Sequence, residues 1–140
     1  MLPDEMDFVT AASLGCRFAT SYRGAVAQGR VAPGEWVAVH GCGGVGMSAV
    51  MIARSLGADV IAVDIDSEVL AIAKELGAAA TIDARKTADV PAAIHDLTDR
   101  GAHLSIDALG SSTTSANSIL SLRKGGRHIQ IGLLAGDDHR

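Results

Sequence analysis

The sequence predicts an α/β domain with a doubly wound parallel sheet of about five strands and helices on both faces. Short apolar stretches alternate with amphipathic stretches along the chain, and a glycine-rich run, Gly41 to Gly46, directly follows the first apolar stretch. The 140 residues are enough for one domain. We therefore expect a single unit over residues 1–140, with a leading helix and turn at 1–33 and the sheet within 34–140.

The leading helix is expected over residues 10–29, with Thr10 as its N-cap and a possible break at Gly15. A turn at 31–34 precedes a short apolar strand at 35–40. The next helix starts near Val45 and ends at Gly57, and a buried strand at 60–63 stops at Asp64. These elements give the order strand, glycine turn, helix, strand.

A second helix begins at Asp66 or Ser67 and ends at Gly77. Its buried stripe is predicted to be Val69, Ile72, Ala73 and Leu76. The remaining expected elements are a weak strand at 80–82, a helix at 91–99, a strand at 104–109, a helix at 111–122 and a strand at 127–132.

A doubly wound order of 3-2-1-4-5-6 needs one more strand after 127–132, and the sequence stops eight residues later. We expect the sixth strand to be missing. The last strand would then present an apolar, unpaired edge. This edge predicts association with a second copy, hence a homo-oligomer.

Composition narrows the function classes. The formal net charge is −4 and the Lys and Arg residues are scattered, which argues against a nucleic-acid partner. No apolar run approaches the roughly 18 residues of a membrane span. The acidic start lacks the basic region of a signal peptide, so we expect a cytoplasmic protein. Cys16 and Cys42 show no C-x-x-C spacing and are expected to be reduced.

The run Gly41-Cys42-Gly43-Gly44-Val45-Gly46 satisfies G-x-G-x-x-G, a pattern that binds dinucleotides in Rossmann-type domains. About 0.2 accidental matches are expected in a chain this rich in glycine, so the pattern gains its weight from the flanking strand and helix. Gly41 permits the tight turn, Gly43 lets the backbone approach the pyrophosphate, and Gly46 lets the helix pack on the strand. The N–H groups of Gly44, Val45 and Gly46 would face the phosphates.

Asp64 lies 18 residues after Gly46, at the end of the next strand. A carboxylate there accepts hydrogen bonds from the adenosine ribose and repels the 2'-phosphate of NADP. The sequence therefore predicts NAD as the cofactor.

The segment Gly15-Cys16-Arg17-Phe18-Ala19-Thr20-Ser21-Tyr22, with His40 to Gly46 about twenty residues later, resembles the zinc-dependent medium-chain alcohol dehydrogenases. In that family the cysteine of G-C-x-x-x-T is a ligand of the catalytic zinc, and the threonine lies against the nicotinamide. The resemblance assigns these roles to Cys16 and Thr20. It also places the ribose site at 63–65, and further cofactor contacts at Ala108, Leu109, Gly110, Ile131, Gly132 and Leu133.

The resemblance implies hydride transfer between an alcohol or aldehyde and NAD, with zinc polarising the oxygen. Family members begin with a catalytic domain that supplies the other zinc ligands, and no such domain is recognisable here. Cys16 would thus be an orphan ligand, and the isolated chain would bind cofactor without turnover. Two alternatives are a stand-alone dinucleotide-binding or regulatory module and an S-adenosylmethionine-dependent methyltransferase.

The remaining histidine, cysteine and hydroxyl residues of interest are expected to have structural rather than catalytic roles. His40, at a strand end, could touch a ligand but is more often structural. A reactive Cys42 would collide with the cofactor phosphates, so it is interpreted as a spacer. Without the family resemblance, Cys16 would be interpreted as a buried helical cysteine. The polar run 111–115 is expected to cap a helix.

Overall fold

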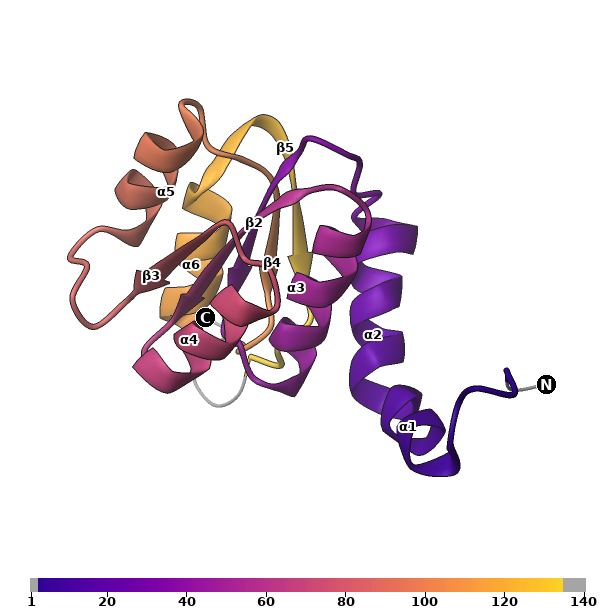
Figure 1. Ribbon diagram of the computed structural model, residues 1–140. Coiled ribbons are helices and arrows are strands. Elements are labelled where there is room, and N and C mark those ends of the chain that lie inside the picture. Colours follow the sequence, from indigo (N-terminus) through magenta and orange to yellow (C-terminus); the bar gives the residue numbers. More distant parts are fainter. Residues whose placement is uncertain (1–2, 135–140) are drawn as a thin grey trace.

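The computed structural model describes residues 3–134, which form a parallel five-stranded sheet between two layers of helices (Figure 1). The strands are β1 (Trp36–His40), β2 (Asp59–Asp64), β3 (Ala80–Asp83), β4 (Ala102–Asp107) and β5 (Leu122–Gln130). Their order in the sheet is β3-β2-β1-β4-β5, and every neighbouring pair is parallel. The predicted fold class is confirmed.

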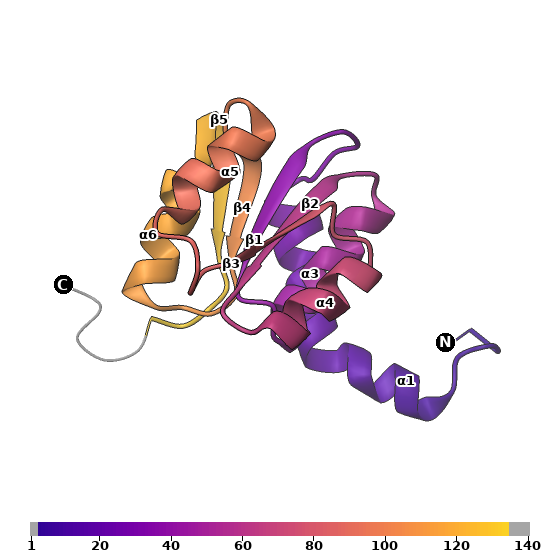
Figure 2. The same ribbon diagram turned by 60° about the vertical axis from the view of Figure 1, so that its left-hand side comes forward.

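Helices α3 (Gly44–Ser55) and α4 (Ser67–Glu75) cover one face of the sheet, and α5 (Val90–Thr98) and α6 (Ser112–Leu120) cover the other (Figure 2). Alternate residues of β1 point to the two layers: Val37 and Val39 pack in the cluster with α3, whereas Ala38 packs in the cluster with α5. Parallel strands buried on both faces are expected to be apolar, and the interiors of β1 and β2 are, with polar residues only at the strand ends.

The leading helix runs from Phe8 to Gln28 as α1 (Phe8–Ser13), η1 (Leu14–Phe18), α2 (Ala19–Tyr22) and η2 (Arg23–Gln28), with π-helical turns in η1 and η2. Gly15 lies in a π-helical turn, so the helix changes its hydrogen bonding there without ending. The predicted cap was wrong: Asp7 caps the helix, because its Oδ1 accepts from the Thr10 backbone N–H.

The caps of the later helices agree better with prediction. Asp66 caps α4, and Ser111 forms a capping box with Thr114 at the start of α6. Gly57 and Gly77 adopt the left-handed conformation expected after their helices. The predicted stripe of α4 was partly wrong, because Ile72 and Leu76 are exposed and Leu70 is buried in their place.

The two last strands also differ from prediction. β4 starts and ends two residues early, which leaves 108–110 as a turn. β5 starts five residues early and ends at Gln130, and a register irregularity between Ala102 and Leu104 accommodates its additional length. β5 is the edge of the described sheet, as expected, but the strand is mainly polar: its only large apolar side chains are Leu122 and Ile129.

Candidate functional site

The glycine turn joins β1 to α3 and brings three backbone segments close together. Gly41 has a φ of +84°, and a Cβ there would lie 2.9 Å from Leu109 Cβ. A Cβ on Gly46 would lie 1.8 Å from the Gly41 carbonyl oxygen, a distance that no side chain tolerates. Glycine is therefore required at Gly41 for the turn and at Gly46 for the contact between helix and turn.

Gly43 differs from its neighbours. Its φ is −66°, and no heavy atom lies within 4 Å of the position a Cβ would take. Neither conformation nor packing demands glycine here. A Cβ would instead fill the open space beside the turn, which is the space that an approaching pyrophosphate needs.

Helix α3 begins without a capping side chain at Gly43. The N–H groups of Gly44, Val45 and Gly46 find no acceptor within residues 3–134. By contrast, α1, α4, α5 and α6 each have a side chain that accepts from their first turn. The uncapped N–H groups and the helix dipole make this end of α3 suited to an anion.

Asp64 ties the end of β2 to the glycine turn. Its Oδ2 accepts from the Cys42 N–H at 2.7 Å, and its Oδ1 accepts from the N–H groups of Ile65 at 2.7 Å and Asp66 at 3.0 Å. The side chain also lines a pocket of about 790 Å³ beside the turn. The carboxylate is thus held in a fixed orientation at the pocket wall, where ribose hydroxyls could donate to its remaining lone pairs.

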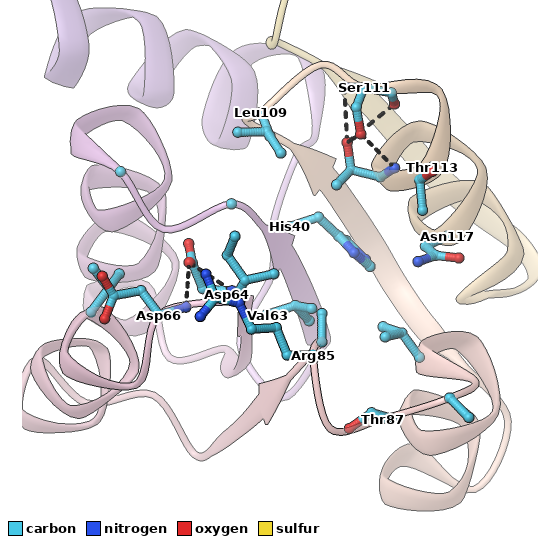
Figure 3. Close-up of a pocket in the computed structure, with 18 residues that line it drawn as sticks. His40, Val63, Asp64, Asp66, Arg85, Thr87, Leu109, Ser111, Thr113 and Asn117 are labelled. Carbon is cyan, nitrogen blue, oxygen red and sulfur yellow. Dashed lines mark hydrogen bonds between the residues drawn. The ribbon is translucent and has the colours of Figure 1, made fainter.

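The pocket lies at the carboxyl ends of β1 to β4, between the two halves of the sheet (Figure 3). Val63, Val69, Val90 and Leu109 give it apolar surface. Its polar side chains are His40, Asp64, Asp66, Arg85, Thr87, Ser111, Thr113, Thr114 and Asn117. Apolar walls with a few polar groups at a sheet's carboxyl edge are typical of a cofactor site.

Cys42, inside the turn, is 2 % exposed and points into the core. Its Sγ lies 3.7 Å from the Val63 carbonyl oxygen, to which the thiol donates. Burial, with the nearby charge of Asp64, raises the pKa of the thiol to about 12. Cys42 is therefore a neutral packing residue, and its interpretation as a spacer rather than a nucleophile agrees with this geometry.

His40 is the last residue of β1, is 1 % exposed and lines the pocket. Its Nε2 has no hydrogen-bond partner among the described residues. Burial lowers the pKa of His40 to about 4, against the opposing charge of Asp107 on the neighbouring strand. The imidazole is therefore neutral at pH 7.

A second group of predicted residues meets at the ends of β4 and β5. A Cβ on Gly110 would lie 2.5 Å from the Gly132 carbonyl carbon, and Gly110 has a φ of +89°. The Ile131 and Gly132 N–H groups both donate to the Asp107 carbonyl oxygen at 2.9 Å. The structure thus brings together the segments 108–110 and 131–133, which the family resemblance had assigned separately to cofactor contacts.

Asp107 holds these segments in place and was missed by the sequence reasoning. Its Oδ1 accepts from Leu109 and Gly110 N–H at 3.0 Å, and its Oδ2 accepts from Gln130 Nε2 at 2.8 Å and Thr114 Oγ1 at 3.3 Å. The side chain is fully buried. The only sequence signal was an aspartate near the end of an apolar strand, directly before the Ala-Leu-Gly turn.

Cys16 and Thr20 lie on the leading helix, and both are exposed. The alternative interpretation of Cys16 as a buried cysteine was wrong. The helix is anchored to the turn by Ser21, whose hydroxyl donates to the Val45 carbonyl oxygen at 2.6 Å. Thr20 therefore flanks the anchored residue, although neither Cys16 nor Thr20 lines the pocket.

Within residues 3–134, no three His, Cys, Asp or Glu side chains gather in a group that could hold a metal ion. Cys16 has no such companions, so the described residues do not form a zinc site by themselves. No helix in this range has the length and hydropathy needed to cross a membrane.

Comparisons with known proteins agree with this geometry. The family pattern "Zinc-binding dehydrogenase" matches residues 44–139. An alcohol dehydrogenase from Geobacillus stearothermophilus is 36% identical over 136 residues, which cover 97% of this chain and 39% of that protein. An alcohol dehydrogenase from Moraxella sp. (strain TAE123) is 36% identical over 137 residues, covering 98% of this chain and 40% of that protein.

Solved structures give the same result. The alcohol dehydrogenase TADH from Thermus sp. ATN1 superposes with a TM-score of 0.88 at 33% identity, over 97% of this chain and 39% of that one. A structure described as an NAD-dependent alcohol dehydrogenase gives a TM-score of 0.87 at 31% identity, over 98% of this chain and 40% of that one. The chain spans about two fifths of the length of these relatives, and it belongs to the zinc-binding dehydrogenase family as a cofactor domain of the Rossmann type.

Proposed function

We propose that this chain is the NAD-binding part of an alcohol dehydrogenase that transfers hydride between an alcohol and NAD. One observation carries the proposal. Gly43 has no side chain at a position where neither its φ nor any described neighbour requires glycine, directly beside three N–H groups that have no acceptor among the described residues. The residues present therefore fit a dinucleotide, whose pyrophosphate would occupy the open space.

Each half of the cofactor has residues to hold it in this proposal. The adenosine would lie in the 790 Å³ pocket, with its ribose hydroxyls donating to Asp64. The nicotinamide end would lie against Thr20 and the segment 131–133. The bound nicotinamide would supply the hydride chemistry. The residues of this chain would bind and orient it.

Zinc and the alcohol or aldehyde belong to the larger protein in this proposal. Cys16 would contribute one zinc ligand, with the others coming from sequence that the relatives have beyond the matched two fifths. The 140 residues alone would then bind cofactor without turning over alcohol. A stand-alone dinucleotide-binding module remains the alternative, whereas family membership favours a dehydrogenase over a methyltransferase.

The role of Asp64 can be tested by titrating NAD and NADP into the wild-type chain and Asp64→Ala by calorimetry. A hydrogen bond to a charged group contributes about 1.5–3 kcal/mol, so we expect NAD affinity to fall roughly ten- to hundredfold. NADP should lose less, because its 2'-phosphate is no longer repelled. The measured quantity is the ratio of the two affinities, since loosening the glycine turn would weaken both cofactors alike.

Asp59→Ala is the matched control for this titration. Asp59 is exposed at the opposite end of the same strand, and its removal changes the net charge equally. We expect it to leave the NAD to NADP ratio unchanged. If Asp64→Ala also left the ratio unchanged, Asp64 would not select the cofactor.

The free edge of the sheet is the proposed site of self-association. No other strand within residues 3–134 pairs with the outer side of β5. Its unpaired N–H and C=O groups could pair with a second copy. Sedimentation equilibrium should then give a mass above the 14.3 kDa of one chain. A concentration-independent mass of 14.3 kDa would contradict association of this chain through its edge.

A further inference from the structure

Arg17 lies against the start of α3, although the glycine motif includes no basic residue. A Cβ built on Gly44 would lie 2.5 Å from Arg17 Cδ, and 3.0 Å from both Nε and Nη1. Gly44 is the first residue of α3. The Arg17 side chain is exposed to solvent and lies beside the turn, next to N–H groups that have no acceptor among the described residues.

The guanidinium of Arg17 is unpaired among the described residues. No carboxylate or carbonyl oxygen within residues 3–134 accepts from it. Arg127 shows the usual alternative: its guanidinium donates to the Glu35 carboxylate and to the Gly29 carbonyl oxygen. Among the residues that the structure describes, Arg17 therefore retains all its donors for a ligand, and no carboxylate pairs with its charge.

The backbone of Arg17 is tied to the same turn. The Ser21 hydroxyl lies 2.8 Å from the Arg17 carbonyl oxygen and 2.6 Å from the Val45 carbonyl oxygen, in the first turn of α3. Ser21 is fully buried. The backbone from which the Arg17 side chain extends is thus fixed relative to the first turn of α3, which keeps the guanidinium within reach of a ligand bound there.

We propose that Arg17 binds the diphosphate of the dinucleotide and adds a charged contact to the N–H groups of the glycine turn. The inference rests on the proposed function, because it takes the turn to be the cofactor site. The planar guanidinium presents paired donors that match two phosphate oxygens, and such charge-assisted hydrogen bonds are stronger than neutral ones. The contact is independent of Asp64, which faces the ribose.

Calorimetric titrations of NAD, NADP and ADP into the wild-type chain and Arg17→Gln test the proposal, with adenosine measured by competition. We expect Arg17→Gln to weaken all three diphosphate ligands by roughly ten- to hundredfold. The NAD to NADP ratio and the affinity for adenosine, which has no phosphate, should stay unchanged. Arg17→Lys should recover part of the loss, because it restores the charge without the planar pair of donors.

Two further readouts separate binding from a structural effect. Arg17→Gln should keep the wild-type melting temperature, and the dependence of NAD affinity on salt should become shallower because one phosphate contact is lost. Lys124→Gln is the matched control, because it removes the same charge from an exposed position in the early part of β5. It should leave the affinities for the diphosphate ligands and for adenosine unchanged.

The outcomes distinguish this inference from the proposed function. Equal NAD affinities for the wild type and Arg17→Gln would overturn the role of Arg17 and leave the cofactor site intact. An equal loss of adenosine binding would also overturn it, since the effect would not depend on phosphate. A wild-type chain that binds neither NAD nor ADP would contradict the proposed function and this inference together.

Discussion

Gly46→Ala should unfold this domain or lower its melting temperature by about 10 °C or more. The added Cβ would stand 1.8 Å from the Gly41 carbonyl oxygen, so α3 and the turn would have to separate. Overpacking a core usually costs about 1–3 kcal/mol, and a clash with backbone lies at the upper end of that range or above. A domain of this size is stable by only about 5–15 kcal/mol. Thermal unfolding followed by circular dichroism measures the effect.

Gly43→Ala is the matched control for that experiment. It makes the same substitution three residues earlier, where no heavy atom lies within 4 Å of the new Cβ and φ is −66°. We expect its melting temperature to stay within about 2 °C of the wild type. Equal melting temperatures for Gly46→Ala and the wild type would contradict the close approach of helix and turn.

Acidification should destabilise the domain through His40. Burial lowers the pKa of His40 in the folded chain to about 4, from an ordinary value near 6.5. Between these values the unfolded chain binds a proton that the folded chain does not. Stability therefore falls as pH drops from about 7 to about 4, by about 3 kcal/mol in total, and this contribution levels off below pH 4.

His40→Gln isolates that contribution, because glutamine does not titrate. Urea unfolding at pH 7 and pH 4.5 should show a smaller loss of stability in His40→Gln than in the wild type. Other groups cancel in the comparison. They include His103, whose pKa is lowered by partial burial and by Arg123, and Glu35, where burial raises the pKa but Arg127 and the Ala32 N–H together lower it further. Equal losses in both proteins would show that His40 is not kept neutral by burial.

The glycine turn and Asp64 could be predicted from sequence because their requirements are local. A left-handed turn at Gly41 and a close helix at Gly46 demand glycine whatever the rest of the chain does. The spacing to Asp64 follows from the length of one helix and one strand. Caps such as Asp66 and Ser111 are similarly determined by a few neighbouring residues.

Features that depend on tertiary packing were beyond prediction. In α4, a helix of nine residues, the apolar positions fit two overlapping faces, and only contact with the sheet selects Leu70 over Ile72. At the start of β5, Leu122 pairs with Ala102 of β4, and the register then skips Arg123, Lys124 and the two glycines to resume at Arg127. The sequence of these four residues predicts a turn, so the early start of β5 depends on one pairing across the sheet.

In the site, too, the residues that could not be predicted are those whose roles depend on tertiary packing. Asp107 is important because two separate loops converge on its side chain and backbone, and nothing in its neighbouring residues indicates that convergence. Arg17 reaches the turn because the leading helix packs beside α3, through the Ser21 hydrogen bond and the apolar contacts of Phe18. The sequence contains both residues, but it does not indicate the contacts that either residue makes.

The central claim is that the glycine turn binds a dinucleotide through its pyrophosphate, and calorimetric titration of NAD into the wild-type chain and Gly43→Ala tests it most directly. We predict that the wild type binds NAD and that Gly43→Ala, folded and equally stable, binds it at least roughly tenfold more weakly, because the methyl group occupies the phosphate space. Unchanged affinity in Gly43→Ala, or no NAD binding by the wild type, would contradict the claim.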